Sequence, residues 1–531
     1  MPAGMEQTMR PLLWRAANFY PNKQIVSRTH TGENRYNYSS YSNRVNRLAH
    51  ALTEYGIQQG DRVATLSWNH HKHFETYFSV PLIGAQLHTI NPLLSSEQIQ
   101  YILADADDQL IFVDRSFVPI LKSAIDTIST IEKGDLILMD NSRMDDFDIP
   151  TYEEFIRSHP PTYDWPDLDE NQPAGLCYTS GTTGDPKGVE YTHQMLWGHT
   201  MSMLTPQGIP ITDDDTVMPV VPMFHVNAWG FPLAATTAGA GHVYPGPSPD
   251  SADIVELIER EKVTISAGVP SVWLKVIDYA ENNEVNFTSL DTIAVGGSAV
   301  PKSMIRWFDT HDTEVIHAWG MTEASPIGTV SNLKSSLTDI EYESRVDQRA
   351  KQGIPLPGVE IQAIGDDGKK VPWDNETLGE LWIRGPWITT EYFGHSDTSE
   401  ESFENGWLRT GDIVTIDDEG YINIVDRAED IIKSGGEWIS SIKIENIIMK
   451  HDGVIETAVI GVPDEKWQER PAAFIIPDES INPNTLTDRI TSHIESEYPS
   501  WWVPDTIEYV DKIPKTGTGK ISKKDIREQY I

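Results

Sequence analysis

Short apolar runs alternate with amphipathic helical patterns through the first four-fifths of the chain. Arg62–Trp68 has the composition of a strand, His71–Ala85 has helical periodicity, and Gln86–Ile90 is a second short strand. The same alternation returns between residues 252 and 318. This pattern is typical of parallel strands joined by helices. We therefore predict an α/β fold whose large N-terminal body consists of layered, mostly parallel sheets.

The pattern changes in the last third of the chain. From Gly358 to Ile424, short strands are separated by Gly, Pro and Asp turns, which predicts an antiparallel β subdomain. After Asp426, helical and strand patterns alternate over about 100 residues, the size of a small domain. We therefore predict an N-terminal domain over residues 1–426 and a small, mobile α+β lid over residues 427–531. The predicted hinge lies at Asp426–Asp430.

Composition limits the partners and the environment of the chain. Its 531 residues include 80 acidic and 41 basic ones, which gives a formal net charge of −39. Contacts with a nucleic-acid backbone need clustered Lys and Arg, so nucleic acid is not expected as a partner. An acidic excess spread over a folded chain is typical of halophile proteins, in which salt screens the self-repulsion.

Three further features predict a cytoplasmic location. The single cysteine, Cys177, excludes an internal disulfide and fits a reducing compartment. The N-terminus lacks the apolar core and small-residue cleavage site of a signal peptide. The most apolar stretch, Val226–Pro245, is interrupted by glycines and polar residues. We expect it to be buried core rather than a membrane span.

The most informative string runs from Tyr178 to Gly188 and reads YTSGTTGDPKG. Its hydroxyls and glycines offer side-chain donors and bare backbone N–H groups to a polyanion, and Lys187 adds a positive charge. An ordinary Gly/Thr surface loop would not need all of these groups together. A Walker-type loop needs Gly-Lys-Ser/Thr, whereas Lys187 stands between Pro186 and Gly188. The string therefore predicts a phosphate-binding loop that is not a P-loop.

Six motifs in a fixed order make the chain similar to the adenylate-forming superfamily of acyl-CoA synthetases, peptide-synthetase adenylation domains and firefly luciferase. The match covers nearly the whole length. Besides the phosphate loop, the motifs are GGSAVP at Gly296–Pro301, HAWGMTE at His317–Glu323, WLRTGD at Trp407–Asp412, DRAEDIIKSGG at Asp426–Gly436 and KTGTGK at Lys515–Lys520. The resemblance implies that ATP, Mg²⁺ and coenzyme A bind to the chain.

The resemblance also assigns the nucleotide site residue by residue. Phosphates would bind to Thr179, Ser180, Gly181, Thr182, Thr183, Gly184 and Lys187. Adenine would lie along a strand end without bulky side chains, formed by Gly297, Ser298, Ala299, Trp319, Gly320, Met321 and Thr322. Asp412 would accept hydrogen bonds from the ribose, with Arg427 beside it. Glu323, expected at the end of a strand, and Thr182 would bind Mg²⁺.

Catalytic roles follow from the same resemblance. Lys520 would stabilise the charge that develops as a carboxylate attacks the α-phosphate of ATP. Lys433, with Gly435 and Gly436, would serve the second half-reaction, in which glycines line the passage for the pantetheine arm of coenzyme A. Glu429 would be the pivot about which the lid turns. The neighbouring Lys523 and Lys524 are expected to belong to a solvated basic tail.

The strings PMFHVNAWG, WGMTE and SGGEWIS resemble the branch of medium-chain fatty-acyl-CoA ligases and methylmercaptopropionate-CoA ligases. The implied acyl pocket is apolar and rather closed, and consists of His225, Trp229, Val269, Gly296, Met321 and Trp438. His225 would also sense the carboxylate or gate the pantetheine tunnel. We therefore predict an ATP-dependent, AMP-forming acid–CoA ligase for a short- or medium-chain carboxylic acid.

Several alternatives stay open at this level. The acid could be an aryl acid or methylmercaptopropionate, and the acceptor could be a carrier protein instead of coenzyme A. The oligomeric state is open, with a homodimer under consideration. The histidines at positions 70, 71 and 73 have a spacing that does not converge on one helix face, so we expect no metal site there.

Overall fold

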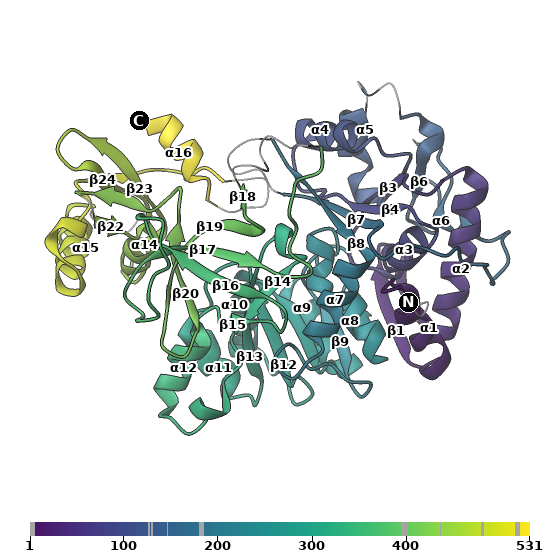
Figure 1. Ribbon diagram of the computed structural model, residues 1–531, viewed down its shortest axis with the longest axis horizontal. Helices are drawn as coiled ribbons and strands as arrows, with labels where there is room; N and C mark the ends of the chain where they lie inside the picture. Colours follow the sequence, from purple (N-terminus) through teal and green to yellow (C-terminus); the bar gives the residue numbers. More distant parts are fainter. Residues whose placement is uncertain are drawn as a thin grey trace. The chain divides into compact units, whose positions relative to one another are not determined.

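The computed structural model describes residues 6–125, 128, 131–145, 147–179, 185–394, 399, 402–435, 437–478, 483–515 and 521–530. The chain separates into two compact units (Figure 1). The first contains Met1–Thr179, Pro186–Glu360 and Ile383–Leu408, and the second contains Ser180–Asp185, Ile361–Trp382 and Arg409–Ile531. The domain boundary predicted at residue 426 falls inside the second unit and stays a prediction.

The first unit contains a long, mostly parallel sheet. Its strand order is β15-β14-β13-β12-β11-β9-β10-β1-β2. The strands from β13 to β1 pair in parallel, whereas β14, β15 and β2 pair antiparallel at the two edges. The bounds are β1 Gln24–Thr29, β2 Gly32–Asn37, β9 Thr216–Pro219, β10 Gly241–Tyr244, β11 Ile265–Gly268, β12 Thr292–Gly296, β13 Glu314–Gly320, β14 Ile327–Val330 and β15 Ile354–Pro355.

A second sheet of this unit runs in the order β6-β5-β3-β4-β7-β8. It is parallel except for the β7–β8 hairpin. The bounds are β3 Arg62–Leu66, β4 Gln86–Thr89, β5 Leu110–Val113, β6 Leu136–Leu138, β7 Pro173–Tyr178 and β8 Gly188–Thr192. The α/β body with mostly parallel sheets that the sequence predicts is therefore confirmed.

Helices follow most strands of the first unit, as crossover connections between parallel strands require. The bounds are α1 Arg10–Phe19, α2 Tyr38–Tyr55, α3 His71–Leu82, α4 Ser96–Ala106, α5 Val118–Ile125, α6 Tyr152–Ile156, α7 His193–Met203, α8 Phe231–Ala238, α9 Ser251–Glu261, α10 Pro270–Asn282, α11 Lys302–Asp309 and α12 Tyr342–Ala350. Every residue of α3 is buried, so this helix is part of the core. The core beside the long sheet includes Val243, Ile258, Trp273, Ile293 and Phe308.

A third sheet contains β16 Glu360–Ile364, β17 Gly379–Arg384, β18 Phe403–Glu404, β19 Trp407–Ile416 and β20 Ile422–Arg427. In this sheet β19 pairs antiparallel with both β18 and β20. The C-terminal part of the second unit has the sheet order β22-β21-β24-β23, with β25 beside β24. Its elements are β21 Ile432–Ser434, β22 Glu437–Ile439, α14 Ser441–Met449, β23 Val454–Asp464, β24 Gln468–Pro477, α15 Pro483–Glu497, β25 Thr506–Tyr509 and α16 Lys523–Tyr530. Ile432, Ile447, Ile475 and Ile490 pack in its core.

The apolar stretch Val226–Pro245 is buried, as predicted, because it supplies α8 and β10 to the interior of the first unit. Across the ranges that the structure describes, no helix combines the length and the apolar character needed to cross a bilayer.

Candidate active site

The two ends of the phosphate loop are fixed by the β7–β8 hairpin. The backbone N–H of Thr179 donates to the carbonyl of Lys187 over 2.9 Å, and the N–H of Lys187 donates to Oγ1 of Thr179 over 3.2 Å. A β-carbon at Gly188 would lie 3.2 Å from the ring of Tyr178 and 3.0 Å from Phe393, so glycine allows these close contacts. The predicted phosphate ligands Ser180, Gly181, Thr182, Thr183 and Gly184 lie outside the described residues.

Glu323 lies in the short helical turn Thr322–Ala324, after β13 has ended at Gly320. The expectation that it ends a strand is therefore wrong, because the chain leaves the sheet three residues earlier. Glu323 is 6% exposed, and its Oε1 accepts a hydrogen bond of 2.8 Å from the hydroxyl of Tyr392. Its carbonyl accepts from the N–H of Thr389 over 2.9 Å. The segment around Tyr392 therefore fixes both the backbone and the side chain of Glu323.

Tyr392 also connects Glu323 with the phosphate loop. The Nζ of Lys187 lies 4.8 Å from the centre of the Tyr392 ring, within the range of a cation–π interaction. The next residue, Phe393, donates its N–H to the carbonyl of Gly188 over 2.8 Å. One short segment thus holds the loop lysine and the buried carboxylate together. No sequence pattern pointed to Tyr392, because its contacts join segments that are far apart in the chain.

Gly296 and Gly297, at the end of β12 beside β13, form a tightly packed contact that we call the glycine seam. Gly296 pairs with Ala318, and a β-carbon at Gly296 would lie 2.3 Å from the carbonyl oxygen of Ala318 and 3.3 Å from the indole of Trp229. At Gly297, with a φ of +81°, a β-carbon would lie 3.3 Å from the side chain of Val269. The structure therefore brings together the predicted acyl-pocket residues Trp229, Val269 and Gly296.

Trp229 is held by an unusual turn. Val226, Asn227, Ala228 and Trp229 have positive φ values of 44°, 55°, 48° and 55°. Left-handed backbone costs about 1–2 kcal/mol for each residue that carries a side chain, so tertiary packing must hold this turn. Trp229 itself is 8% exposed, whereas the preceding His225 is exposed. No propensity of the sequence Val-Asn-Ala-Trp signals this conformation.

The remaining predicted residues of this unit lie around the end of β13. Trp319 is 8% exposed and lies close to Gly328, where a β-carbon would be 2.8 Å from the indole. The carbonyl of Thr322 accepts a hydrogen bond of 2.8 Å from the hydroxyl of Tyr191. Gly297, Ser298, Ala299 and Gly320 are exposed, and Met321 is half-buried. The assignment of these residues to adenine stays a prediction.

In the second unit, the ribose-binding candidates form an ion pair. Nη1 of Arg427 lies 2.6 Å from Oδ1 of Asp412, which is 5% exposed. The hinge candidate Glu429 is exposed as a whole residue, but its carboxyl group is partly buried. This burial raises the pKa of the carboxyl, and the negative charge of the neighbouring Asp430 raises it further. Arg527 of α16 donates to the carbonyl of Glu429 over 3.0 Å and to Asp430 over 2.7 Å.

The candidates for the second half-reaction lie on the β21–β22 hairpin. Lys433 is exposed, and its Nζ lies 5.9 Å from the ring centre of Trp438. Gly435 has a φ of +64°, and a β-carbon there would lie 2.8 Å from the indole of Trp467. Gly436 lies outside the described residues.

Lys520 also lies outside the described residues, as does the whole of 516–520. The ends of this segment are set by an antiparallel bridge between Lys515 and Ile521. The prediction of a solvated Lys523 is wrong. Its side chain is 11% exposed and forms an ion pair of 2.8 Å with Glu445, and its Nζ donates to Oγ of Ser441 over 2.6 Å.

The histidines near α3 are structural. His70 lies 2.9 Å from Asp114, His73 lies 3.0 Å from Thr65, and His71 lies 2.9 Å from Asn34. Over the described part of the chain, no group of three or more His, Cys, Asp or Glu side chains is arranged to hold a metal ion.

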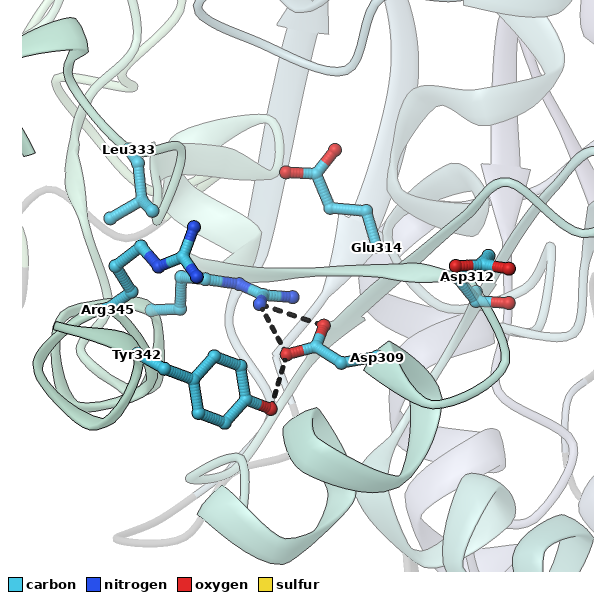
Figure 2. A pocket seen from close by; sticks show the side chains of 8 residues that line it. Asp309, Asp312, Glu314, Leu333, Tyr342 and Arg345 are labelled. Atoms are coloured by element: carbon cyan, nitrogen blue, oxygen red, sulfur yellow. Dashed lines mark hydrogen bonds and ion pairs between the residues drawn. The ribbon is translucent and has the colours of Figure 1, made fainter. Parts of the chain in front are cut away.

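A separate cavity of about 340 Å³ lies at the opposite end of β13, beside Glu314 (Figure 2). Arg349 forms an ion pair of 2.9 Å with Asp309. The hydroxyl of Tyr342 donates to the same carboxylate over 2.9 Å (Figure 2). No predicted site residue lines this cavity.

Comparison with known proteins places the chain in a family. The family model of the AMP-binding enzyme matches residues 13–393, and that of the AMP-binding enzyme C-terminal domain matches residues 443–520. A long-chain-fatty-acid–CoA ligase of Thermus thermophilus is 41% identical over 528 residues, which cover 99% of this chain and 96% of that protein. A 3-methylmercaptopropionyl-CoA ligase of Ruegeria pomeroyi is 40% identical, with 98% and 96% covered.

A solved structure of an anthranilate CoA ligase in complex with anthranoyl-AMP superposes with a TM-score of 0.85 at 25% identity, and the match covers 99% of this chain and 98% of that one. The chain belongs to the AMP-binding enzyme family. The sequence-based prediction of an acid–CoA ligase of the AMP-forming kind is confirmed by these relatives.

Proposed function

We propose that the chain is an ATP-dependent ligase that converts a short- or medium-chain carboxylic acid to its CoA thioester through an acyl-adenylate. The observation that carries this proposal is the contact of Tyr392 with both Lys187 and Glu323. It places a phosphate-loop cation and a buried carboxylate around one phenol ring. The glycine seam of Gly296 leads along β13 to the same carboxylate.

In the first half-reaction, a carboxylate oxygen of the acid attacks the α-phosphorus of ATP, and the bond to pyrophosphate breaks. Lys187 and the loop N–H groups would bind the phosphates, and Lys520 would offset the charge that develops at the α-phosphate. Glu323 suits a Mg²⁺ ion, because its buried carboxylate is a hard oxygen ligand that shares the contact residue Tyr392 with Lys187. When bound, Mg²⁺ would neutralise phosphate charge.

In the second half-reaction, the sulfur of coenzyme A attacks the carbonyl carbon of the acyl-adenylate, and AMP leaves with the bonding electron pair. We propose that residues 427–531 turn about Glu429 between the two steps, so that Lys433 and the glycines after it replace Lys520. Arg427, paired with Asp412, would hold the ribose end of the nucleotide. One pocket would thereby serve two reactions.

The substrate is proposed from the pocket walls and the relatives. Trp229 and Val269 present apolar surface at the glycine seam, which favours an aliphatic acid. Relatives of nearly equal identity act on long-chain fatty acids and on 3-methylmercaptopropionate, so identity alone does not rank these acids. An aryl acid and methylmercaptopropionate stay alternatives. We also propose that the enzyme is cytoplasmic and halophilic and that it uses Mg²⁺. That it forms a homodimer stays a prediction.

A substrate panel tests the proposal. The full chain would be assayed for AMP release that depends on coenzyme A, with straight-chain acids of three to twelve carbons, 3-methylmercaptopropionate, benzoate and cinnamate. We expect the highest kcat/KM with a short or medium aliphatic acid. Equal or higher turnover with benzoate would reverse the substrate assignment. Absence of AMP release with every acid, at low and at molar salt, would overturn the proposed function.

A further inference from the structure

His199 lies on α7 and contacts two segments that are distant from it in the sequence. Only 2% of its surface is exposed. On one side lies Gly230, which ends the left-handed turn that carries Trp229. On the other side lies Ile327, the first residue of β14, at the exit of the loop that carries Glu323. No motif of the sequence includes His199.

The contact with the turn is a close packing of ring against backbone. A β-carbon at Gly230 would lie 2.8 Å from Cε1 and 3.0 Å from Nδ1 of His199, so the imidazole occupies the space that a side chain there would need. Left-handed backbone is unfavourable for the four residues that precede Gly230, and such a turn persists only when its surroundings hold it. The ring of His199 is one of these surroundings.

The contact with the Glu323 loop is a hydrogen bond. The N–H of Ile327 donates to Nε2 of His199 over 3.3 Å, which places the ring hydrogen on Nδ1. Ile327 is 3% exposed, so its N–H has no access to water and needs this acceptor. Burial lowers the pKa of His199 to about 3, so the ring is a neutral acceptor at physiological pH.

Trp387 also contacts Ile327, where the loop that carries Glu323 ends. Its indole N–H donates to the carbonyl of Ile327 over 3.3 Å, and its ring meets that of His199 edge-on with 5.9 Å between the centres. Ser325 donates its hydroxyl to the carbonyl of Trp387 over 2.6 Å. His199 and Trp387 therefore form a buried cluster around Ile327, and the turn that carries Trp229 packs against this cluster through Gly230.

We propose that His199 is a positioning residue. It sets the spacing between two walls of the site, namely the turn that carries Trp229 and the loop that carries Glu323. This inference rests on the proposed function, since the acid is expected beside Trp229 and the metal-bound phosphates of ATP beside Glu323. Attack on the α-phosphate needs the reacting atoms at near-attack distance, and a displacement of about 1 Å costs on the order of 100-fold in rate. Loss of the imidazole would remove a contact from the turn and a contact from the loop at the same time.

Three variants test the role of the ring. His199→Leu fills a similar volume without an acceptor, and His199→Gln places an amide oxygen near the position of Nε2. The control His193→Leu removes another buried histidine of α7, whose Nδ1 accepts a hydrogen bond of 3.4 Å from the N–H of Met9. Rates of acid-dependent ATP–pyrophosphate exchange and thermal midpoints would be measured for each.

We expect His199→Leu to lower kcat/KM for the acid by at least about tenfold, mainly through kcat, because alignment acts in the transition state. His199→Gln should stay within about threefold of the unchanged chain, and His193→Leu within about twofold even where its thermal midpoint falls. Kinetics of His199→Leu that match those of His193→Leu would overturn the inference. Equal impairment of His199→Gln and His199→Leu would also overturn it.

If His199→Leu does not fold, His199→Asn replaces it, because its shorter amide reaches only the position of Nδ1. The same loss of kcat/KM is then expected, and kinetics like those of the control would refute the role. Failure of the proposed function is distinguishable, because the unchanged chain would then show no exchange with any acid of the panel.

Discussion

The hydroxyl of Tyr392 donates a hydrogen bond of 2.8 Å to Oε1 of Glu323, although 69 residues separate the two in the chain. The same phenol ring lies 4.8 Å from Nζ of Lys187. A single side chain thus connects the carboxylate proposed to bind the metal with the cation proposed to bind phosphate.

Replacing Tyr392 by Phe should separate these two contacts. The ring stays beside Lys187, whereas the donor to Glu323 is lost, which costs about 1–3 kcal/mol for a buried bond to a charged group. We expect kcat/KM for MgATP in pyrophosphate exchange to fall about tenfold. Tyr342→Phe is the matched control, because its hydroxyl binds Asp309 at the separate cavity. Exchange that is equal in the two variants would contradict the role of Tyr392.

Replacing Lys520 by Ala should abolish acid-dependent ATP–pyrophosphate exchange. The family resemblance places this lysine at the α-phosphate, where loss of a cation removes transition-state stabilisation worth several kcal/mol. Lys524→Ala is the control, because Lys524 is half exposed and lies 4.0 Å from Glu528. Unchanged exchange in Lys520→Ala would refute the assigned role.

Replacing Lys433 by Ala should spare adenylation and slow thioester formation. Lys433 lies on the β21–β22 hairpin, which the family resemblance links to the second half-reaction only. Pyrophosphate exchange and CoA-dependent AMP release would be measured on the same preparation. We expect exchange within about twofold of the unchanged chain and AMP release at least tenfold slower. A parallel fall of both rates would show that Lys433 acts earlier.

Salt should stabilise the folded chain. A net charge of −39 repels itself, and the Debye length falls to about 3 Å at 1 M salt. Surface ion pairs are screened as well, but each contributes about 0–1 kcal/mol, so relief of the net repulsion dominates. We expect the thermal midpoint and the exchange rate to rise with KCl up to molar concentrations. A chain that is most stable and most active in dilute buffer would rule out the halophile proposal.

Acid should unfold the chain cooperatively. Burial lowers the pKa of His73, His199 and His242 to about 3 and that of His193 and His317 to about 4. In the unfolded chain these groups titrate near 6.5, so below that pH the unfolded state binds protons that the folded state does not. The contribution of these histidines to the free energy of unfolding is therefore complete above about pH 6.5. It falls on acidification, by up to about 1.4 kcal/mol per pH unit for each histidine.

Denaturant titrations between about pH 5 and 8 would measure this slope. His193→Leu should reduce the proton uptake on unfolding by about one and flatten the pH dependence accordingly. A free energy of unfolding that is constant down to pH 5 would contradict the neutral state of these buried rings.

Helices and strands with a clear hydrophobic period were predictable from the sequence. The residues at which they begin and end were not. The predicted strand Arg62–Trp68 ends at Leu66 in the structure, because Ser67 and Trp68 donate hydrogen bonds to the side chain of Asp114 instead of continuing the ladder. Such ends depend on single side chains that periodicity does not report.

The site was predictable only where chemistry follows sequence motifs. Lys187, Glu323 and the glycines near Gly296 were predicted from motifs, since phosphate and metal ligands need these residue types. Tyr392 and His199 were not, because both act through contacts between distant segments. The left-handed turn before Gly230 was not predictable either, since Val, Ala and Trp prefer right-handed backbone and only tertiary packing can hold them otherwise.

Helix α16 is bound to α14 by one residue and to the proposed hinge region by another. Lys523 near its start is anchored to Glu445 and Ser441 of α14, and Arg527 is anchored to Asp430 and to the carbonyl of Glu429. The segment that contains Lys520 directly precedes this helix. If residues 427–531 turn about Glu429 as proposed, these contacts would make α14 and α16 turn together. The hinge angle would then set the position at which α16 begins, at Lys523, three residues after the lysine proposed to act at the α-phosphate.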